Sequence, residues 1–476
     1  MKAVAALVVL LAMAQWRPEE RVLLSDFSYV DAVAASPWLV FAATRHGLLV
    51  YDRMTRAWKP PITTLDGYPT SRVRVAIADP AGNAVWLGIG RGGGLDRYVR
   101  YDVDARLWTS GTPPADAQAR VMTVEAALAR APAADALRAL ILTDPRLRSY
   151  QFTAAAGTRD RPELYFGTNG MGVVRVDPQT AEWETLPYGL MAPGVGAIAA
   201  APPPEGIWAA TNARPGERRG LTWVAADLSV TRSTEGGGAA LGFTFLSARR
   251  LLAARGALWL ATEQGVLRIE PATLRGRRFD LERVTSLAPA PDGVWVGSTR
   301  GLSVITDDGR IEPVGARELV VLSLLAVRDT LWVGTVAGVG CLPPGASAVT
   351  EPPALGGRPS LRVPILALAR VQDTIVLATE RELAWRNAAT DTWSLVPMPL
   401  ALGLPTVLAA DPDGGVWIGG TQGLAHADVG RAVIRTLTVP LDLPAAARDV
   451  IADRDYLWVA TDSGLVRFDR RAARAR

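Results

Sequence analysis

The chain has 476 residues, of which 49% are apolar and 21% are charged, as in globular proteins and unlike disordered ones. Lysine occurs only at Lys2 and Lys59, so nearly all of the positive charge is arginine, and the net charge is only +4. Because no concentrated basic face is visible in the sequence, we expect no binding to nucleic acid. The single cysteine, Cys341, excludes an intrachain disulfide and stands where other copies of a repeat carry an apolar strand residue, so we expect it to be buried.

The N-terminal segment has the pattern of a secretory signal. One lysine precedes twelve apolar residues, from Ala3 to Ala14, which end in Ala12-Met13-Ala14. This stretch is too short to span a bilayer, which takes about 20 residues. The alternative is a buried N-terminal strand or helix. We expect residues 1–14 to be a signal peptide and residues 15–476 to form a mature secreted or periplasmic protein without a transmembrane anchor.

A short motif recurs along the chain, in stretches such as "TLWVGTVAGVGCL", "GVWVGSTRGLSVI", "ELYFGTNGMGVVRVD" and "YLWVATDSGLVRFD". Its copies are separated by 36 to 51 residues, except for one interval of 79, and such a period indicates an array of supersecondary units. Aligned on the aromatic residue, the copies fall at Phe41, Trp86, Tyr165, Trp208, Trp259, Trp295, Trp332, Trp417 and Trp458, with a degraded tenth copy at Val376.

The unit from residue 403 to residue 428 predicts three short strands. The strands "TVLAAD", "VWIGG" and "LAHAD" are separated by the turn "PDGG" and by a hairpin that contains Gly423. In other copies a fourth strand follows, and it carries Trp58, Trp108, Trp183 or Trp393. Four antiparallel strands in about 40 residues, without helices between them, are typical of a propeller blade.

The sequence therefore predicts an all-β protein, a β-propeller of about ten four-stranded blades in one large ring or two smaller ones. The last copy has no fourth strand, and the stretch "ERVLLSDFSYV" precedes the first copy, so we expect an N-terminal strand to complete the last blade. We expect the motif aromatics to pack between blades rather than to stack on carbohydrate. The small residue that follows them, as at Gly334, would let strands approach one another closely.

The repeats resemble the two-component regulator propeller repeats of bacterial extracytoplasmic sensors. The matching residues are Gly403-Leu404-Pro405, "DPDG" at 411–414, "VWIGG" at 416–420 and "GL" at 423–424, with weaker matches through most of the mature chain. The resemblance implies a propeller that senses ligands outside the cell. Members of that family are often fused to a membrane span and a histidine kinase, and this sequence contains neither.

One insertion, at about residues 112–148, interrupts the repeats. It is rich in Ala, Leu and Arg and has no glycine between its prolines, so it predicts two short helices divided at Pro132. It falls between the fourth strand of one blade and the first strand of the next. Two interpretations stay open: helices that cap the propeller channel or offer a partner surface, and an insertion that simply packs on the rim.

The sequence gives little support to a catalytic or cofactor site. The glycines Gly88, Gly90 and Gly93 match a dinucleotide fingerprint, but they occupy a hairpin position with no helix after it, so we interpret them as an enlarged loop. Only His46 and His426 are present, which excludes a histidine-rich metal centre and argues against a catalytic triad. We therefore predict no cofactor, no metal and no specific catalytic residue.

The hairpins that follow the motif aromatics offer the one candidate ligand site, because such loops gather at one end of a propeller. Arginine outnumbers acid there, which would suit an anionic or polyhydroxylated ligand; the alternative is a ring of solvated loops. The candidate ligand-binding residues are Arg45, His46, Arg91, Asn169, Arg214, Arg218, Glu263, Gln264, Arg300, Gln422 and Asp462.

Three functional hypotheses follow. The first is a secreted or periplasmic propeller that acts as a sensor-like module for a small anionic or carbohydrate ligand or for a protein partner. The second is a propeller enzyme, a lyase or hydrolase, that acts on an anionic or carbohydrate substrate at the mouth of the channel. The third is a scaffold that recognises other proteins through its rim and its helical insertion.

Overall fold

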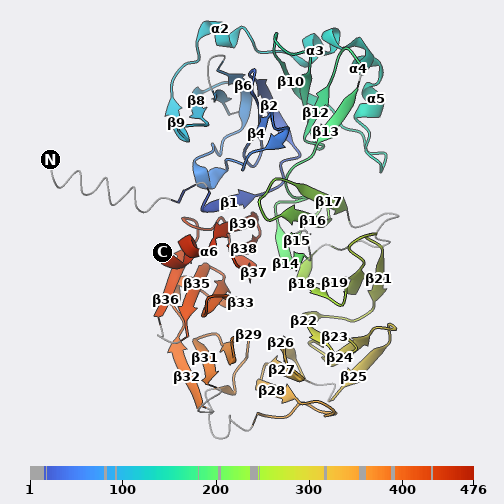
Figure 1. Cartoon of the computed structure of the whole chain (residues 1–476), viewed down its shortest axis with the longest axis vertical. Helices are drawn as coiled ribbons and strands as arrows, with labels where there is room; N and C mark the ends of the chain where they lie inside the picture. Colours follow the sequence, from blue (N-terminus) through green and yellow to red (C-terminus); the bar gives the residue numbers. More distant parts are fainter. Residues whose placement is uncertain are drawn as a thin grey trace, which may run out of the picture. The chain divides into compact units, whose positions relative to one another are not determined.

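The structure is a computed structural model of the whole chain (Figure 1). It describes residues 16–17, 19–79, 83–91, 94–180, 182–201, 205–235, 245, 247–315, 319–352, 361–387, 392–429 and 433–476. The predicted signal peptide, residues 1–14, lies outside the described residues. Within these ranges, no helix combines the length and the apolar character needed to cross a membrane.

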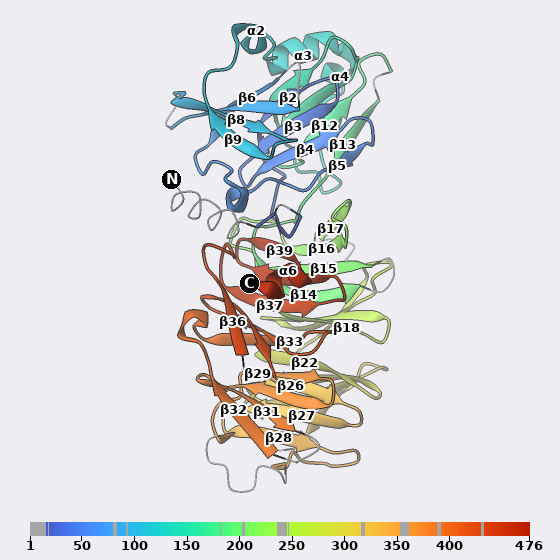
Figure 2. The ribbon, with the colours of Figure 1, turned by 60° about the vertical axis from the view of Figure 1, so that its left-hand side comes forward.

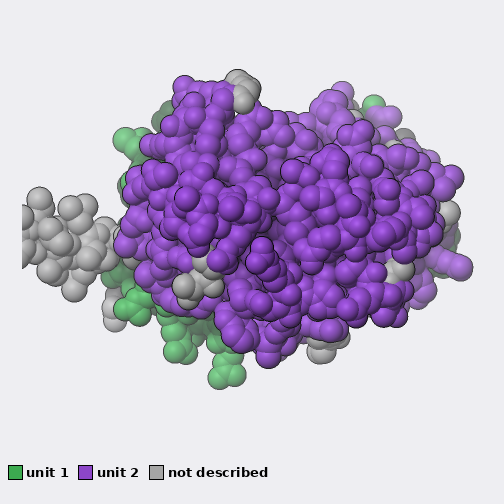
Figure 3. All heavy atoms as spheres, turned by 90° about the horizontal axis from the view of Figure 1, so that it is seen from above, with its two compact units in different colours: residues 1–23, 288–461, 465–476 green, residues 24–287, 462–464 purple. Residues whose placement is uncertain are grey.

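Antiparallel sheets make up the described fold. Nine of the ten sheets have four strands and one, β26–β28, has three, so the chain is a multi-blade β-propeller as the repeats predict. The polypeptide divides into two compact units, unit 1 (residues 1–23, 288–461 and 465–476) and unit 2 (residues 24–287 and 462–464), which are coloured separately in Figure 3.

The strands of unit 1, including three that cross its borders, are β1 (Arg21–Leu24), β22 (Val284–Ala290), β23 (Gly293–Ser298), β24 (Gly301–Thr306), β25 (Ile311–Val314), β26 (Val321–Val327), β27 (Thr330–Thr335), β28 (Gly338–Leu342), β29 (Ala367–Val371), β30 (Thr374–Ala378), β31 (Glu382–Asn387), β32 (Thr392–Pro397), β33 (Pro405–Ala410), β34 (Val416–Gly420), β35 (Gly423–Asp428), β36 (Val433–Thr438), β37 (Ala447–Ala452), β38 (Tyr456–Thr461) and β39 (Gly464–Asp469). Its helices are the 3-10 turn η4 (Leu400–Leu402) and α6 (Arg470–Ala475).

The strands of unit 2 are β2 (Val30–Ala35), β3 (Leu39–Thr44), β4 (Leu48–Asp52), β5 (Ala57–Trp58), β6 (Val73–Ala78), β7 (Ala84–Ile89), β8 (Arg97–Asp102), β9 (Leu107–Ser110), β10 (Phe152–Gly157), β11 (Leu164–Thr168), β12 (Val173–Val176), β13 (Trp183–Leu186), β14 (Val195–Ala201), β15 (Gly206–Thr211), β16 (Gly220–Ala225), β17 (Thr231–Glu235), β18 (Ala248–Ala254), β19 (Ala257–Thr262), β20 (Gly265–Ile269) and β21 (Gly276–Phe279). Its helices are η1 (Thr64–Asp66), α2 (Ala115–Gln118), α3 (Val124–Arg130), α4 (Pro132–Ala136) and α5 (Arg138–Ile141).

In unit 1 the first strand of each sheet packs beside the first strand of the next, through β26, β29, β33 and β37. The final sheet has the order β1-β39-β38-β37, so the N-terminal strand completes it, as predicted. Trp16 anchors this strand: its indole N–H donates to Asp442 at 2.8 Å, and its ring centroid lies 5.0 Å from that of Phe468. The first and last parts of the chain are thereby joined within one blade.

In unit 2 the sheet β2–β5 is covered on both faces, by the sheet β6–β9 and by the sheet β10–β13 (Figures 1 and 2). One face contributes Phe41 and Val50 to an apolar cluster with Val85 and Leu87 of the sheet β6–β9. On the other face, Val30 lies so close to Gly167 of β11 that an added Cβ at Gly167 would come within 2.7 Å of it. The three sheets therefore form a continuous stack.

The insertion covers the remaining face of the sheet β10–β13. It contains four short helices, α2 to α5, rather than the two predicted, and Pro132 opens α4. Leu128 and Ile141, on the sheet side of these helices, pack against Phe152, Phe166 and Val174. The helices thus cover the face where a further blade would otherwise pack.

Most motif aromatics lie in the core, as predicted. Phe41, Trp417 and Trp458 are fully buried, whereas Trp86 is partly exposed. At Gly334 an added Cβ would lie 2.2 Å from Ser323 Oγ and 2.9 Å from the Ile365 carbonyl, so the small residue permits the close approach of strands. The prediction of a buried Cys341 is also confirmed.

The glycine-rich stretch is a hairpin loop, as predicted. Gly88 belongs to β7, Gly90 follows it, and the next element of the chain is β8 rather than a helix. Gly93 lies outside the described residues. The dinucleotide interpretation, which requires a helix after the glycines, is therefore wrong for this segment.

Candidate functional site

The predicted ligand residues occupy the turns between the second and third strands of their sheets, as the repeat predicts. Nine of the eleven belong to unit 2, and their ligand-binding role stays a prediction. The unit 2 residues are Arg45, His46, Arg91, Asn169, Arg214, Arg218, Glu263, Gln264 and Asp462, and the unit 1 residues are Arg300 and Gln422.

Four of the predicted residues gather around the segment Asp26–Tyr29, which leads into β2. His46 Nδ1 lies 2.7 Å from the Asp26 carbonyl oxygen, and Arg218 forms an ion pair of 3.2 Å with the Asp26 carboxylate. The Arg45 guanidinium lies 3.5 Å above the ring of Tyr29, which also pairs through its backbone with Asn169. These contacts, three through side chains and one through the backbone of Asn169, fix the segment Asp26–Tyr29 against the hairpins.

The other predicted residues of unit 2 make separate contacts. Asp462 accepts a hydrogen bond from the Asn212 amide at 2.9 Å, and the Glu263 carboxylate accepts one from the Ser247 backbone N–H at 3.1 Å. The Gln264 side-chain oxygen lies 3.4 Å from Arg278 Nη1. The Arg91 and Arg214 backbone N–H groups donate to Asp96 and Glu217, respectively.

The two predicted residues of unit 1 are fixed through their backbones. The Arg300 N–H donates to Ser298 Oγ at 3.1 Å, within its own hairpin. The Gln422 N–H donates to the Leu402 carbonyl at 3.0 Å, which ties its hairpin to η4. These contacts are those of well-formed turns, and none of them by itself indicates a ligand.

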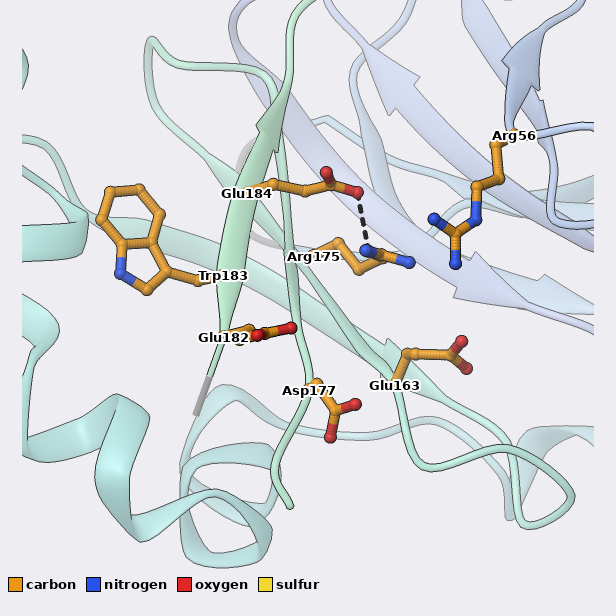
Figure 4. A pocket seen from close by; sticks show the side chains of 7 residues that line it. All are labelled: Arg56, Glu163, Arg175, Asp177, Glu182, Trp183 and Glu184. Atoms are coloured by element: carbon orange, nitrogen blue, oxygen red, sulfur yellow. Dashed lines mark ion pairs between the residues drawn. The ribbon is translucent and has the colours of Figure 1, made fainter. Parts of the chain in front are cut away.

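In unit 2, a pocket of about 590 Å³ opens at the end of the sheets β2–β5 and β10–β13 that lies opposite their predicted ligand hairpins. It is formed at the turns that join first to second and third to fourth strands (Figure 4). We call it the mixed-charge pocket. Its six charged residues come from the β4–β5 turn, the β10–β11 turn, β12, the β12–β13 turn and β13. They are Arg56, Glu163, Arg175, Asp177, Glu182 and Glu184.

Strand alternation decides which side chains face the mixed-charge pocket. Arg175 and Glu184 are cross-strand partners in β12 and β13, so they point to the same side of the sheet. Trp183 pairs with Val176, so its side chain points to the other side of the sheet, although the residue borders the pocket (Figure 4). The pocket is therefore lined by charged groups rather than by an aromatic platform.

Two ion pairs hold the walls of the pocket. Arg175 Nε lies 2.8 Å from Glu184 Oε1, and Arg53 Nη2 lies 2.9 Å from Glu163 Oε2. The Arg53 side chain is only 1% exposed and also donates to the Ser36 carbonyl, so it holds the Glu163 carboxylate in a fixed position. Asp177 accepts hydrogen bonds from the backbone N–H groups of its own turn.

Two side chains of opposite charge are left for a ligand. Within the part of the chain that the structure describes, neither the Arg56 guanidinium nor the Glu182 carboxylate makes a side-chain hydrogen bond or ion pair. They come from different sheets and from different sides of the pocket (Figure 4). Both are exposed to solvent.

The charged residues of the mixed-charge pocket affect the pKa of Tyr51. Burial raises the pKa of its hydroxyl, and the neighbouring Tyr165 and Glu184 raise it further, whereas Arg175 and Arg56 oppose the shift. The hydroxyl therefore stays protonated at neutral pH. It can donate a hydrogen bond, but it cannot act as a base there.

Sequence reasoning missed the mixed-charge pocket. Arg56 lies far along the chain from Glu182, and only the packing of β2–β5 on β10–β13 brings their sheets together. The one local signal was the run "EWETLP", in which two glutamates alternate with Trp183 in a fourth strand and so share one face. Among the described residues, no group of three or more His, Cys, Asp or Glu side chains is arranged to hold a metal ion.

Comparison with solved structures finds other propeller-like proteins. PorZ, an essential surface component of the type-IX secretion system of Porphyromonas gingivalis, is 10% identical, with 94% of this chain and 87% of PorZ covered and a TM-score of 0.53. Virginiamycin B lyase from Staphylococcus aureus is 13% identical over 58% of this chain and 94% of the lyase, with a TM-score of 0.46. The extracellular domain of a candidate one-component system of B. thetaiotaomicron is 12% identical over 92% of this chain and 69% of that domain, with a TM-score of 0.45.

These identities support a shared fold and nothing finer. No protein-family model matches the chain, and no curated protein does. The resemblance to two-component regulator propeller repeats therefore stays a prediction. Extracellular domains of candidate hybrid two-component systems of B. thetaiotaomicron are among the structural neighbours.

Proposed function

We propose that this chain is an extracytoplasmic β-propeller that binds a small ligand carrying both a carboxylate and an ammonium group, in the mixed-charge pocket. The observation that carries the proposal is the pair Arg56 and Glu182, two exposed and oppositely charged side chains on different sides of one pocket. The predicted signal peptide supports the location outside the cytoplasm.

The chemistry of the two groups matches such a ligand. The planar Arg56 guanidinium can donate two parallel hydrogen bonds to a carboxylate, and Glu182 can accept hydrogen bonds from an ammonium group. The ion pairs Arg175–Glu184 and Arg53–Glu163 keep the remaining charges of the walls satisfied and in place. The volume of about 590 Å³ lies within the range typical of small-molecule sites.

The probe L-alanyl-L-alanine tests the proposal, because two derivatives each lack one charge: the N-acetyl form lacks the ammonium group and the amide lacks the carboxylate. We expect Arg56→Gln to weaken binding of the dipeptide by roughly 10- to 100-fold, as for a lost charged hydrogen bond. The same variant should leave binding of the amide unchanged. Glu182→Gln should weaken the dipeptide similarly and leave the N-acetyl form unchanged. Isothermal titration and thermal shift would measure these differences.

Arg106→Gln is the matched control, because Arg106 has a φ of 54° and Arg56 a φ of 55° in equivalent third-to-fourth strand turns of neighbouring sheets. Equal loss of binding with Arg106→Gln, or equal binding of all three probes, would overturn the proposal. The alternative function is a propeller enzyme that acts at this pocket. It would be favoured if the protein hydrolysed the dipeptide and if Glu182→Gln abolished that turnover while binding persisted.

A further inference from the structure

Strand β4 places a tyrosine in the space between the two sheets that form the mixed-charge pocket. Tyr51 is the last residue but one of this strand and pairs with Trp58 of β5. Its neighbour Val50 lies in the apolar cluster that faces the sheet β6–β9. Because successive residues of a strand point to opposite sides of a sheet, the Tyr51 side chain points toward the sheet β10–β13.

The sheet β10–β13 turns charged groups toward the same space. Tyr165 pairs with Arg175, and Arg175 pairs with Glu184, so these three side chains point to one side of their sheet. This side faces β2–β5, because the guanidinium carbon of Arg53, which directly follows β4, lies 5.4 Å from the centroid of the Tyr165 ring. Tyr51 therefore lies on the opposite wall from Arg175 and Glu184, both of which line the mixed-charge pocket (Figure 4).

The Tyr51 hydroxyl has no hydrogen-bond partner among the residues that the structure describes, although Tyr51 is only 3% exposed. Its oxygen is not one of the fully enclosed polar atoms without a partner, so the small exposed part of Tyr51 includes this oxygen. Buried tyrosine hydroxyls usually find a hydrogen-bond partner. A buried and unbonded hydroxyl that still touches solvent beside a pocket is therefore available to a bound molecule.

Charges from both walls of the pocket act on this hydroxyl. Burial is the largest cause that raises its pKa, and Glu184 of one wall raises it further, whereas Arg175 of that wall and Arg56 of the other oppose the shift. Arg175 and Glu184 already pair with each other at 2.8 Å. The hydroxyl is therefore neutral at neutral pH, and it offers a ligand a hydrogen-bond donor rather than a charge.

A neutral donor suits the part of the ligand that lies between its two charges. The proposed ligand has its carboxylate at Arg56 and its ammonium group at Glu182, on different sides of the pocket (Figure 4). A peptide bond between these ends presents a carbonyl oxygen that can accept from Tyr51. A chain of methylene groups presents no acceptor and would leave the buried hydroxyl unpaired, which is unfavourable.

We propose that the Tyr51 hydroxyl donates a hydrogen bond to a peptide carbonyl of the ligand, so that the mixed-charge pocket selects dipeptides over other molecules with the same two end charges. This inference rests on the proposed function, because it concerns the same pocket. Trp58, whose ring centroid lies 5.1 Å from that of Tyr51, packs against the tyrosine ring and orients its hydroxyl.

Glycylglycine and 5-aminopentanoate test the inference. Both carry an ammonium group and a carboxylate separated by the same number of bonds, but 5-aminopentanoate has methylene groups in place of the amide. We expect Tyr51→Phe to weaken binding of glycylglycine by roughly 3- to 10-fold, as for one lost hydrogen bond, and to leave binding of 5-aminopentanoate unchanged. Isothermal titration would measure the affinities of both compounds for both proteins, and comparing the two losses cancels the difference in flexibility between the compounds.

Tyr101→Phe is the matched control, because Tyr101 pairs with Trp108 in the sheet β6–β9 as Tyr51 pairs with Trp58 in the sheet β2–β5. Tyr101 is also buried, but it belongs to the apolar cluster on the other face of β2–β5. This variant should leave binding of both compounds unchanged. The inference would be wrong if Tyr101→Phe caused the same loss, or if Tyr51→Phe weakened both compounds equally.

The two proposals fail in different ways. If both compounds bind the parent protein and Tyr51→Phe weakens neither, the hydroxyl contacts only water and the inference is wrong, while the proposed function stands. If neither compound binds the parent protein, the proposed function is wrong and the inference falls with it. Thermal unfolding of Tyr51→Phe should match that of the parent protein, because the hydroxyl that it removes has no partner among the described residues.

Discussion

Ile141→Asp is expected to lower the free energy of unfolding of unit 2 by more than about 4 kcal/mol, whereas Leu140→Asp at the preceding residue should change it by about 0.5 kcal/mol or less. Ile141 is fully buried and Leu140 is 61% exposed, although both lie in the short helix α5. The two variants introduce the same charge at neighbouring positions. The difference between their free energies of unfolding therefore measures how much the burial of residue 141 against the sheet contributes to stability.

The large effect follows from what Ile141 covers. It belongs to the apolar cluster in which Leu128 and Ala134 of the insertion pack on Phe152 and Phe166 of the sheet β10–β13. An aspartate there would lose the apolar contact and place an unpaired carboxylate in an apolar site, which is among the costliest point changes. Loss of these helices would also expose the sheet face to solvent.

Thermal and urea unfolding of both variants, with dye binding to detect exposed apolar surface, would check this expectation. We expect dye binding at room temperature for Ile141→Asp and none for Leu140→Asp. Equal stability of the two variants would mean that the insertion only packs on the rim and contributes little to the stability of the fold.

Arg470→Met is expected to destabilise unit 1 by about 3 to 5 kcal/mol, because it leaves a buried carboxylate without its partner. The Arg470 side chain is 1% exposed and the Asp411 side chain is fully buried, and the two form an ion pair. Arg470 also reaches Asp413 Oδ2 at 2.7 Å, so it ties the C-terminal helix α6 to the "DPDG" turn between β33 and β34.

The rest of this buried network makes the loss costly. Asp411 also accepts a hydrogen bond from the Trp417 indole at 3.0 Å and lies 3.1 Å from His426 Nε2. A methionine in place of Arg470 fills the volume but leaves the charge of Asp411 with fewer compensating groups.

Urea unfolding followed by tryptophan fluorescence would measure the loss, with Arg471→Met as the control, since Arg471 is the exposed neighbour of Arg470 in α6. We expect the control to stay within about 0.5 kcal/mol of the parent protein. The double variant Asp411→Asn/Arg470→Met should lose less than the two single losses combined, because both partners of the pair are then removed. Strict additivity would show that the two groups act independently.

Asp411 also predicts how the stability of unit 1 depends on pH. Burial by itself raises the pKa of this carboxyl, but the adjacent His426 ring, the Asp413 backbone N–H and the Arg470 charge together hold it below its usual range. A carboxyl with a lowered folded-state pKa stabilises the protein above its unfolded pKa of about 3.9 and loses that contribution as the pH falls through the folded-state value.

The expected result is that the parent protein loses stability more steeply than Asp411→Asn as the pH falls from about 5 to about 3. Unfolding curves collected across this range would compare the two proteins. Parallel curves would show that Asp411 does not contribute through its charge.

Much of the fold could be predicted from the sequence, because its signals are local. Alternating apolar residues, a turn residue such as Gly423, and one aromatic residue in each repeat specify strands and hairpins within about 40 residues. The same regularity placed all eleven candidate ligand residues in hairpins and identified the missing strand that β1 supplies to the last sheet. None of these predictions required knowledge of which distant segments of the chain pack together.

Tertiary structure alone decided the rest, because those features depend on which faces pack together. Helical composition predicted an insertion, but only packing shows that Leu128 and Ile141 cover Phe152 and Phe166. Arg56 and Glu182 face one pocket because two whole sheets stack, and no local pattern encodes that meeting. Trp86, Trp208 and Trp295 follow the repeat like their buried counterparts, yet they are partly exposed, because exposure depends on what packs over each aromatic. The repeated sequence determines the strands and hairpins of each blade, whereas the elements packed against a blade determine which of its surfaces stay accessible for binding.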